Sequence, residues 1–171
     1  MSGKKLQIIY KSLTGNTRQV AEAIRDALGG EEIVYFGEPK PDIVADLYFV
    51  GSWTDKGSCD GTVGEYLKQL EGKKLAVFGT AGYGGSREYY QKLACRVTEC
   101  VPDTSEVLGS FYCQGKMPIG VRNRYVAMLR EHPEDQKLNA SVKNFDEALS
   151  HPDEKDFADA RQWAQTMVDA V

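Results

Sequence analysis

The stretch LQIIYKSLTGNT, residues 6–17, joins a strand-forming run to the start of a helix. The run from Leu6 to Tyr10 is apolar and rich in residues that favour a strand. A polar turn follows, and apolar side chains then recur at near-helical spacing from Val20 to Leu28. The pair Gly29–Gly30 ends this pattern, as glycine commonly does after a helix. The chain therefore begins with a strand, a loop and a helix.

The same alternation recurs as far as Cys113. The apolar runs of the expected strands are continuous, which is typical of parallel strands covered by helices on both faces. We predict an α/β fold, a three-layer doubly wound sheet of five parallel strands whose order the periodicity leaves open. The second crossover, before Leu47, has little room for a helix. Further strands are expected at residues 33–36, 47–51, 75–79 and 107–113, with helices at 61–70 and 86–100.

The alternation stops after Cys113. Residues 114–150 are charged, with helical patches at 121–130 and 142–149, and a last helix is expected to begin near Pro152. A length of 171 residues suits one domain of ordinary size. We predict a single domain, residues 1–171, that carries a helical C-terminal extension from about residue 114.

Composition excludes several classes of function. A net charge of −4 argues against nucleic acid as the main partner. No apolar run approaches the roughly 20 residues of a membrane span, and the first residues lack a signal-peptide pattern. The four cysteines form no CxxC pair, so we expect free thiols and a cytoplasmic protein. Neither His132 nor His151 has a cysteine or a second histidine at metal-site spacing, so no metal is predicted.

Loops at the carboxyl ends of the strands are where an open α/β sheet binds ligands. The first such loop, residues 12–17, combines hydroxyls, an asparagine and Gly15 at a helix start. Amide N–H and hydroxyl groups in that position can hold a phosphate. The nucleotide patterns GxxxxGK[ST] and GxGxxG are absent from the chain. An ordinary N-capping turn is the alternative, because Ser, Thr and Asn favour helix starts.

Aromatic residues stand in the loops after the third and fourth strands. Trp53 lies in the polar segment 51–61, and Tyr83 lies in the glycine-rich turn 79–86. Two such aromatics on neighbouring loops can bracket one planar ring. A ring with a phosphate describes a mononucleotide. The alternative is that Trp53 and Tyr83 only pack against one another.

Residues 12–17 match the Thr/Ser-x-Thr-Gly-x-Thr phosphate loop, and the chain resembles the flavodoxin family from about Lys5 to Cys113 in order and spacing. The resemblance implies strand order 2-1-3-4-5 and non-covalently bound flavin mononucleotide (FMN). The family pattern assigns the phosphate to the first loop, the flavin ring to Trp53 and Tyr83, its pyrimidine edge to the backbone that follows the fourth strand, and its N5 atom to a peptide at Gly57. The implied cofactor-binding residues are Ser12, Leu13, Thr14, Gly15, Asn16, Thr17, Ser52, Trp53, Thr54, Gly57, Thr80, Ala81, Gly82, Tyr83, Gly84 and Gly85.

The segments CQGKMP (113–118) and HPDE (151–154) resemble those of flavodoxin-like proteins of anaerobic bacteria, some of which accompany bilirubin reductase. This resemblance implies a redox protein as partner. Cys113 is either a redox thiol or inert packing. A basic cluster either docks an acidic partner or is a solvated helix face; it comprises Lys116, Arg122, Arg124 and Arg130.

Three functions remain open from the sequence. The first is an electron-transfer flavoprotein whose redox chemistry takes place on FMN, without a catalytic residue of its own. It includes an accessory electron-donor subunit of a reductase such as bilirubin reductase. The second is an FMN-dependent NAD(P)H:acceptor oxidoreductase of the quinone type. The third is an interaction module without flavin.

Overall fold

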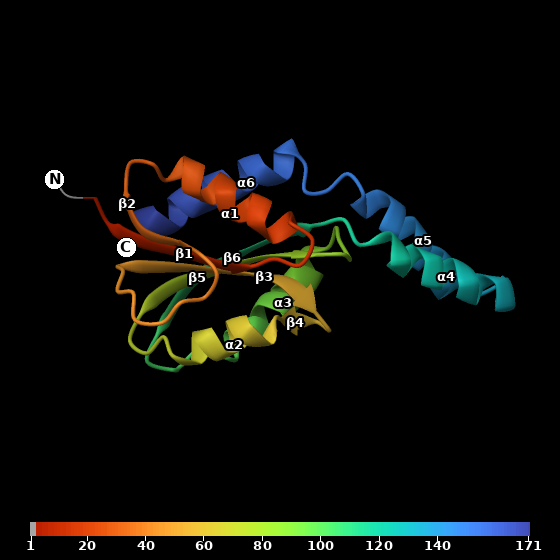
Figure 1. Cartoon of the computed structure of the whole chain (residues 1–171), viewed down its shortest axis with the longest axis horizontal. Coiled ribbons are helices and arrows are strands. Elements are labelled where there is room, and N and C mark those ends of the chain that lie inside the picture. Colours follow the sequence, from red (N-terminus) through yellow and green to blue (C-terminus); the bar gives the residue numbers. More distant parts are fainter. Residues whose placement is uncertain (1–2) are drawn as a thin grey trace.

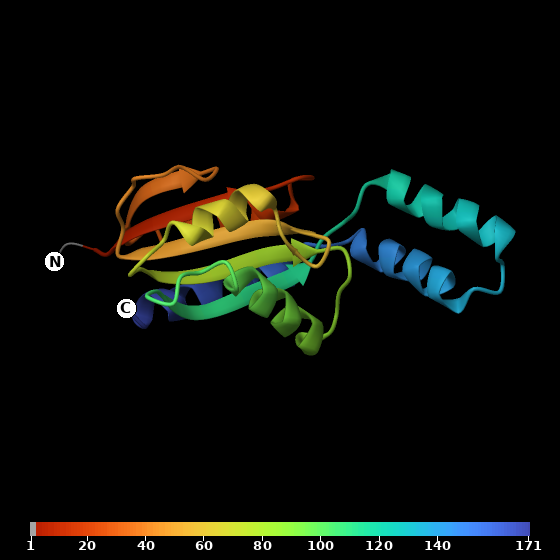
Figure 2. The same cartoon turned by 90° about the horizontal axis from the view of Figure 1, so that it is seen from below.

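The computed structural model describes residues 3–171, which form a parallel sheet between two layers of helices and a helical hairpin at one end (Figures 1 and 2). The five parallel strands are β1 (Lys5–Lys11), β2 (Glu32–Gly37), β3 (Leu47–Asp55), β5 (Lys74–Ala81) and β6 (Glu106–Gln114). The helices are α1 (Asn16–Ala27), α2 (Gly61–Lys68), α3 (Arg87–Thr98), α4 (Ile119–Glu131), α5 (Gln136–Ala148) and α6 (Glu154–Asp169).

The sheet has the order β2-β1-β3-β5-β6. Since β5 and β6 are the fourth and fifth parallel strands, this is the order 2-1-3-4-5, and the predicted fold class is confirmed. The switch point lies between β1 and β3, which pair in parallel from Leu6–Leu47 to Lys11–Ser52. The loops that leave β1, β3 and β5 therefore meet at one edge of the sheet.

Both faces of the sheet are buried, which explains the continuous apolar runs. Ile8 and Phe49 lie in the core beneath α1 and α6, whereas the next residues, Ile9 and Val50, lie in the core beneath α2 and α3. All four side chains have an exposed fraction of 2% or less. Alternate residues of each strand thus supply two separate cores.

The segment after the third strand differs from the predicted loop. Trp53 is still part of β3, and the chain turns back at Lys56 and Gly57 into the short antiparallel strand β4 (Ser58–Cys59). Both turn residues have positive φ angles, 49° and 78°. A two-residue turn of this kind matches the right-handed twist of its strands. The sequence prediction missed it because lysine rarely occupies the first position of such a turn.

The helical extension forms an antiparallel hairpin of α4 and α5 that projects from the carboxyl edge of the sheet (Figures 1 and 2). Arg122 of α4 and Asp146 of α5 pair at 2.8 Å. The α4 helix has no buried residue, whereas Phe145 and Ala148 of α5 are fully buried. Within residues 3–171, no helix combines the length and the hydropathy of a membrane span.

Candidate functional site

A cavity of about 1000 Å³ lies at the carboxyl edge of the sheet, where the loops after β1, β3 and β5 meet the base of the α4–α5 hairpin. Its volume is at the upper end of the range for small-molecule sites, and apolar and aromatic side chains make up much of its wall. The aromatic lining residues are Trp53, Tyr83, Tyr89 and Tyr125.

The loop between β1 and α1 presents a helix N-terminus at which the N–H groups of Asn16 and Thr17 have no acceptor within residues 3–171. Its N-cap residue is Gly15, which has a φ of 94° and makes no side-chain cap hydrogen bond. Ser12 Oγ accepts hydrogen bonds from the N–H of Gly15 at 3.1 Å and of Arg18 at 3.3 Å, which fixes the shape of the loop. The first-turn N–H groups of Asn16 and Thr17 have no intrahelical acceptor. This N-terminus can therefore hold an anion.

The side chains of Asn16 and Thr17 point into the protein. The Thr17 hydroxyl lies 2.9 Å from the hydroxyl of Thr80 on β5, and Thr17 is fully buried. Asn16 Nδ2 donates to the carbonyl of Lys116 at 2.8 Å. The Oδ1 atom of Asn16 is buried and has no hydrogen-bond partner among the described residues. A buried amide oxygen without a donor costs free energy, so this atom favours a ligand that brings a hydroxyl or an N–H group.

The indole of Trp53 is oriented by a hydrogen bond to Asp60, which is itself fixed at the start of α2. Its Nε1 donates to Asp60 Oδ2 at 3.0 Å, and Asp60 Oδ1 accepts from the N–H of Thr62 at the start of α2. Partial burial alone would raise the pKa of Asp60, but hydrogen bonds from Thr62 and Trp53 lower it below its usual value. The ionised carboxylate thus caps α2 and orients the indole in the cavity wall.

The hydroxyl of Tyr83 forms hydrogen bonds with both helices of the α4–α5 hairpin. Its hydroxyl lies 3.2 Å from Ser141 Oγ on α5, and a hydrogen bond with Tyr83 raises the pKa of Tyr125 on α4. The Tyr83 side chain is nevertheless 47% exposed. Among residues 3–171, the rings of Trp53 and Tyr83 form no aromatic pair, although both line the cavity. The space between the two walls is therefore available to a planar ligand.

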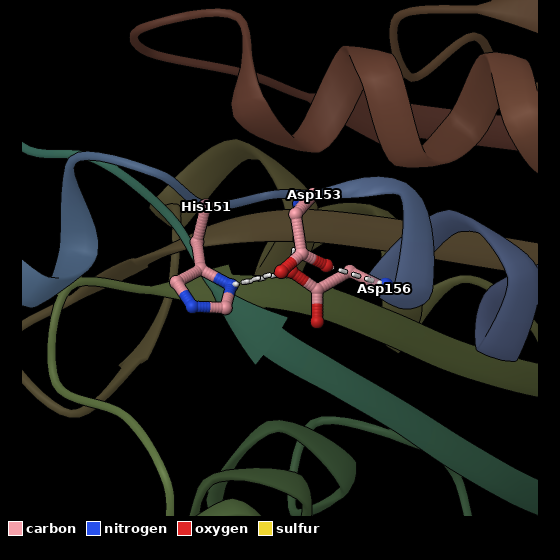
Figure 3. Close-up of side chains that lie close together, drawn as sticks. All are labelled: His151, Asp153 and Asp156. Atoms are coloured by element: carbon pink, nitrogen blue, oxygen red, sulfur yellow. Dashed lines mark hydrogen bonds and ion pairs between the residues drawn. The ribbon is translucent and has the colours of Figure 1, made fainter.

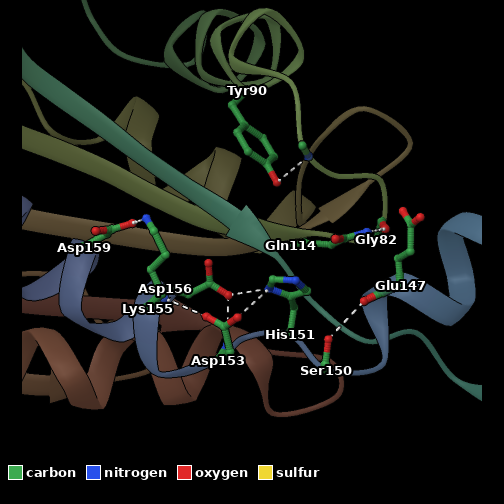
Figure 4. A network of polar contacts seen from close by, with 11 residues as sticks. Gly82, Tyr90, Gln114, Glu147, Ser150, His151, Asp153, Lys155, Asp156 and Asp159 are labelled. Carbon is green, nitrogen blue, oxygen red and sulfur yellow. Dashed lines mark hydrogen bonds and ion pairs between the residues drawn. The ribbon is translucent and has the colours of Figure 1, made fainter.

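The base of the hairpin is attached to the loop after β5 through one carbonyl. Gly82 O accepts from Gln114 Nε2 at 3.1 Å and from Asn144 Nδ2 at 3.0 Å. Figure 4 shows the Gln114 contact beside the start of α6. Gln114 also donates to Asn144 Oδ1 at 3.1 Å. These bonds hold the hairpin over the cavity, so its position depends on β5 and β6.

The structure brings most of the predicted site residues into the cavity wall. Those that line it are Leu13, Thr14, Asn16, Trp53, Thr54, Gly57, Thr80, Ala81, Gly82 and Tyr83. The others support the wall from behind or flank it, as Ser52 does by accepting from the N–H of Asp60. They are Ser12, Gly15, Thr17, Ser52, Gly84 and Gly85.

Half of the residues that line the cavity were not among the predicted site residues. Lys56 enters from the β3–β4 turn, and Tyr89 enters from the first turn of α3. The remaining unpredicted residues come from the segment that leads into α4. The CQGKMP motif of that segment supported a family resemblance, but it gave no indication that the segment lines the cavity. These residues are Gly115, Lys116, Met117, Pro118, Gly120, Val121, Arg124 and Tyr125.

Cys113 lies in the core. Its exposed fraction is 4%, and burial raises the pKa of its thiol. A high pKa and low exposure make a thiol unreactive, so the structure favours inert packing over a redox role. Cys59, Cys95 and Cys100 are free thiols as well, as expected.

A second cluster of polar groups lies at the start of α6. Possible ligand atoms of His151, Asp153 and Asp156 lie within 4.8 Å of one another, a grouping that the spacing in the sequence did not predict (Figure 3). Each aspartate accepts the other's backbone N–H at 2.9 Å, and His151 Nδ1 lies 2.6 Å from Asp156 Oδ2. This is a capping box, so helix capping accounts for the cluster.

The comparison with protein families agrees with this geometry. The family model described as a flavodoxin domain matches residues 7–165. The chain belongs to the flavodoxin family. A flavodoxin-like domain-containing protein BilS from Clostridium symbiosum is 38% identical, and the match covers 90% of each chain. A protein of the same description from Clostridioides difficile is 34% identical, with 96% of each chain covered.

Among solved structures, a short-chain flavodoxin associated with a bacterial microcompartment has a TM-score of 0.62. It is 16% identical, and 98% of each chain is covered. This likeness supports the flavodoxin-like fold. The matches to the BilS proteins span most of the chain, so they extend over the α4–α5 hairpin.

Proposed function

We propose that this protein binds FMN non-covalently in the cavity and carries electrons to or from another redox protein. One observation carries the proposal: the start of α1, where the N–H groups of Asn16 and Thr17 have no acceptor within residues 3–171, opens into a cavity whose wall contains Trp53 and Tyr83. The first-turn N–H groups would hold the phosphate. The two aromatic side chains would lie on the flavin ring.

The residues present fit FMN in three further respects. The buried Asn16 Oδ1 lacks a donor, and the ribityl chain of FMN carries hydroxyl donors. Lys116 lines the cavity beside Asn16 and adds a cation near the phosphate. The apolar wall, which includes Met117 and Val121, would keep water from the ring.

FMN supplies the redox chemistry, and the protein would tune it by binding and orientation. Gly57 is our proposed partner for the flavin N5 atom. It lines the cavity, and its φ of 78° is a conformation that glycine adopts without strain. Its carbonyl now accepts from Arg96 Nη1 at 3.3 Å. A reorientation of this peptide would break that bond and turn the hydrogen-bonding group toward the cavity.

A dedicated reductase, such as bilirubin reductase, is the partner that we propose. The support is the similarity to the BilS proteins and the hairpin that borders the cavity, because a hairpin beside a cofactor enlarges the surface on which a partner can dock. We propose a cytoplasmic location, in keeping with four free thiols.

An absorption spectrum during reductive titration tests the proposal. The purified protein should be yellow, should release FMN on heating or acidification, and should take up electrons in proportion to its FMN. A colourless protein that takes up no added FMN would contradict it. Rapid NAD(P)H oxidation by the isolated holoprotein with a quinone would instead identify a free-standing reductase.

A further inference from the structure

The wall of the cavity is positively charged in an acidic protein. Its charged side chains are Lys56, Lys116 and Arg124, and within residues 3–171 no aspartate or glutamate contributes to it. The whole chain carries a net charge of −4. All three cations are exposed, so they face the solvent at the mouth of the cavity. Cations thus line the cavity of a protein whose net charge is negative.

These cations lack ionic partners. No ion pair is found for any of them in the part of the chain that the structure describes. Arg122, which follows the cavity-lining Val121 on α4, differs because it pairs with Asp146 at 2.8 Å. The basic cluster seen in the sequence is thus divided. Arg122 is neutralised within the hairpin, Arg124 remains free, and Lys56 joins it from the β3–β4 turn.

A phosphate at the start of α1 does not account for all three cations. Lys116 is joined to the start of α1 through its backbone carbonyl, which accepts from Asn16, so we assign this cation to that phosphate. Lys56 belongs to the turn whose Gly57 carbonyl is bonded to Arg96 of α3. The α3 helix covers the opposite face of the sheet from α1 (Figure 1). Lys56 therefore enters the cavity from the α3 side of the sheet edge, and Arg124 enters it from α4.

The surface continues outward along α4. Gly120 and Arg124 line the cavity, and Met128 lies one further turn along the same side of the helix. Met128 is 50% exposed, and Leu13, on the phosphate loop, is 63% exposed. We call the set Leu13, Lys56, Tyr83, Arg124 and Met128 the mouth surface. Exposed apolar side chains among unpaired cations are typical of a protein interface.

We propose that the mouth surface docks a redox protein whose own docking surface is acidic, and that Lys56 and Arg124 steer the encounter. This inference rests on the proposed function. The occupant follows from charge complementarity, since a surface with unopposed cations attracts an acidic patch and repels a basic one. The α4–α5 hairpin projects from the carboxyl edge of the sheet (Figure 2), and α4 lines the cavity, so the partner would contact the hairpin as well as the loops around the mouth.

Two haem proteins of opposite charge provide the test. The reduced holoprotein would be mixed with the acidic soluble domain of cytochrome b5 or with basic cytochrome c. In each case one electron passes from reduced flavin to one ferric haem. For cytochrome b5 we expect a rate constant that falls at least fivefold as salt is raised from low to high concentration, because salt screens the attraction. A rate with cytochrome b5 that is independent of salt, or rises with it, would overturn the proposal.

Charge-reversal variants test whether Lys56 and Arg124 are the residues that attract cytochrome b5. Arg124→Glu and Lys56→Glu should each slow the reaction with cytochrome b5 at low salt by about fivefold, within the range of electrostatic steering. Arg161→Glu, an equal change of charge at an exposed position on α6, should change it less than twofold. Equal effects of Arg124→Glu and Arg161→Glu would show that net charge alone matters and would overturn the proposal.

FMN content is measured first for each variant, so that a failure of the proposed function is seen separately. A wild-type protein that takes up no FMN contradicts the proposed function before any partner is added. If Arg124→Glu folds but loses FMN, Arg124 holds the cofactor and its assignment to docking is overturned. Lys56→Glu then tests the remaining cation.

Discussion

Asn16 Nδ2 donates a hydrogen bond of 2.8 Å to the carbonyl of Lys116. This bond joins the loop between β1 and α1 to the segment that leads into α4. It depends on Gly115, because a Cβ at that position would lie 2.5 Å from Asn16 Nδ2. The two walls of the cavity therefore meet at a point where only glycine fits.

Gly115→Ala should disturb both walls. The added methyl group has to displace Asn16, and overpacking of this kind typically costs about 1–3 kcal/mol. We expect a lower free energy of unfolding in urea and weaker FMN binding. Gly30→Ala is the control, because a Cβ there meets nothing within 4 Å. Equal free energies of unfolding for the Gly115→Ala and wild-type proteins would contradict the close packing of Gly115 against Asn16.

Asn144→Ala should loosen the hairpin from the body. The change removes one of the two side-chain donors to Gly82 O, and a hydrogen bond of this kind contributes about 1 kcal/mol. We expect faster amide hydrogen exchange in residues 82–85 and at the end of α5. Asn139→Ala is the matched control, because Asn139 bonds only the backbone near its own helix. Unchanged exchange in residues 82–85 would refute the anchoring role.

Asp60→Ala should destabilise α2 and release Trp53. Loss of an N-cap side chain costs about 1 kcal/mol, and the indole would lose its acceptor. Urea unfolding and Trp53 fluorescence would measure the two effects, with Asp60→Asn as the conservative variant. Because the pKa of Asp60 is lowered in the folded state, its contribution is present above the unfolded pKa and is lost as pH falls through the folded pKa. A stability of Asp60→Ala that equals the wild type at pH 7 would contradict this role.

Tyr90 should make the protein sensitive to alkali. Burial raises the pKa of Tyr90 to about 12. The unfolded chain therefore loses this proton at lower pH than the folded protein does, and the contribution of Tyr90 to stability decreases between about pH 10 and 12. In Tyr90→Phe the loss of stability over this range should be shallower. The same slope in both proteins would show that Tyr90 titrates normally.

Local patterns in the sequence were enough to predict the strands of the sheet and the loop between β1 and α1, whereas the order of the strands came from the family resemblance. Ile8 and Ile9 are apolar because each face of the strand meets its own helix layer, and this leaves a continuous run that can be recognised without a structure. The helix that begins at Asn16 was likewise marked by its polar turn and its apolar spacing.

The rest of the cavity depends on contacts between segments far apart in the chain. Arg124 and Tyr125 belong to a helix without a buried residue, so no apolar stripe could show which side faces the cavity. Lys56 is placed by a turn of positive φ that its residue type does not favour. The family resemblance assigns Thr17 to the phosphate; its hydroxyl lies against Thr80 on β5, and its N–H group stays at the start of α1.

Calorimetric titration of the apoprotein with FMN and with riboflavin tests the assignment of the cavity most directly. Riboflavin has the same ring and ribityl chain but lacks the phosphate. Two charge-assisted hydrogen bonds from the start of α1, at about 1.5–3 kcal/mol each, correspond to at least a hundredfold difference in affinity. We predict one FMN per chain, bound at least a hundredfold more tightly than riboflavin. Equal affinities for the two flavins, or no binding of either, would contradict the proposed site.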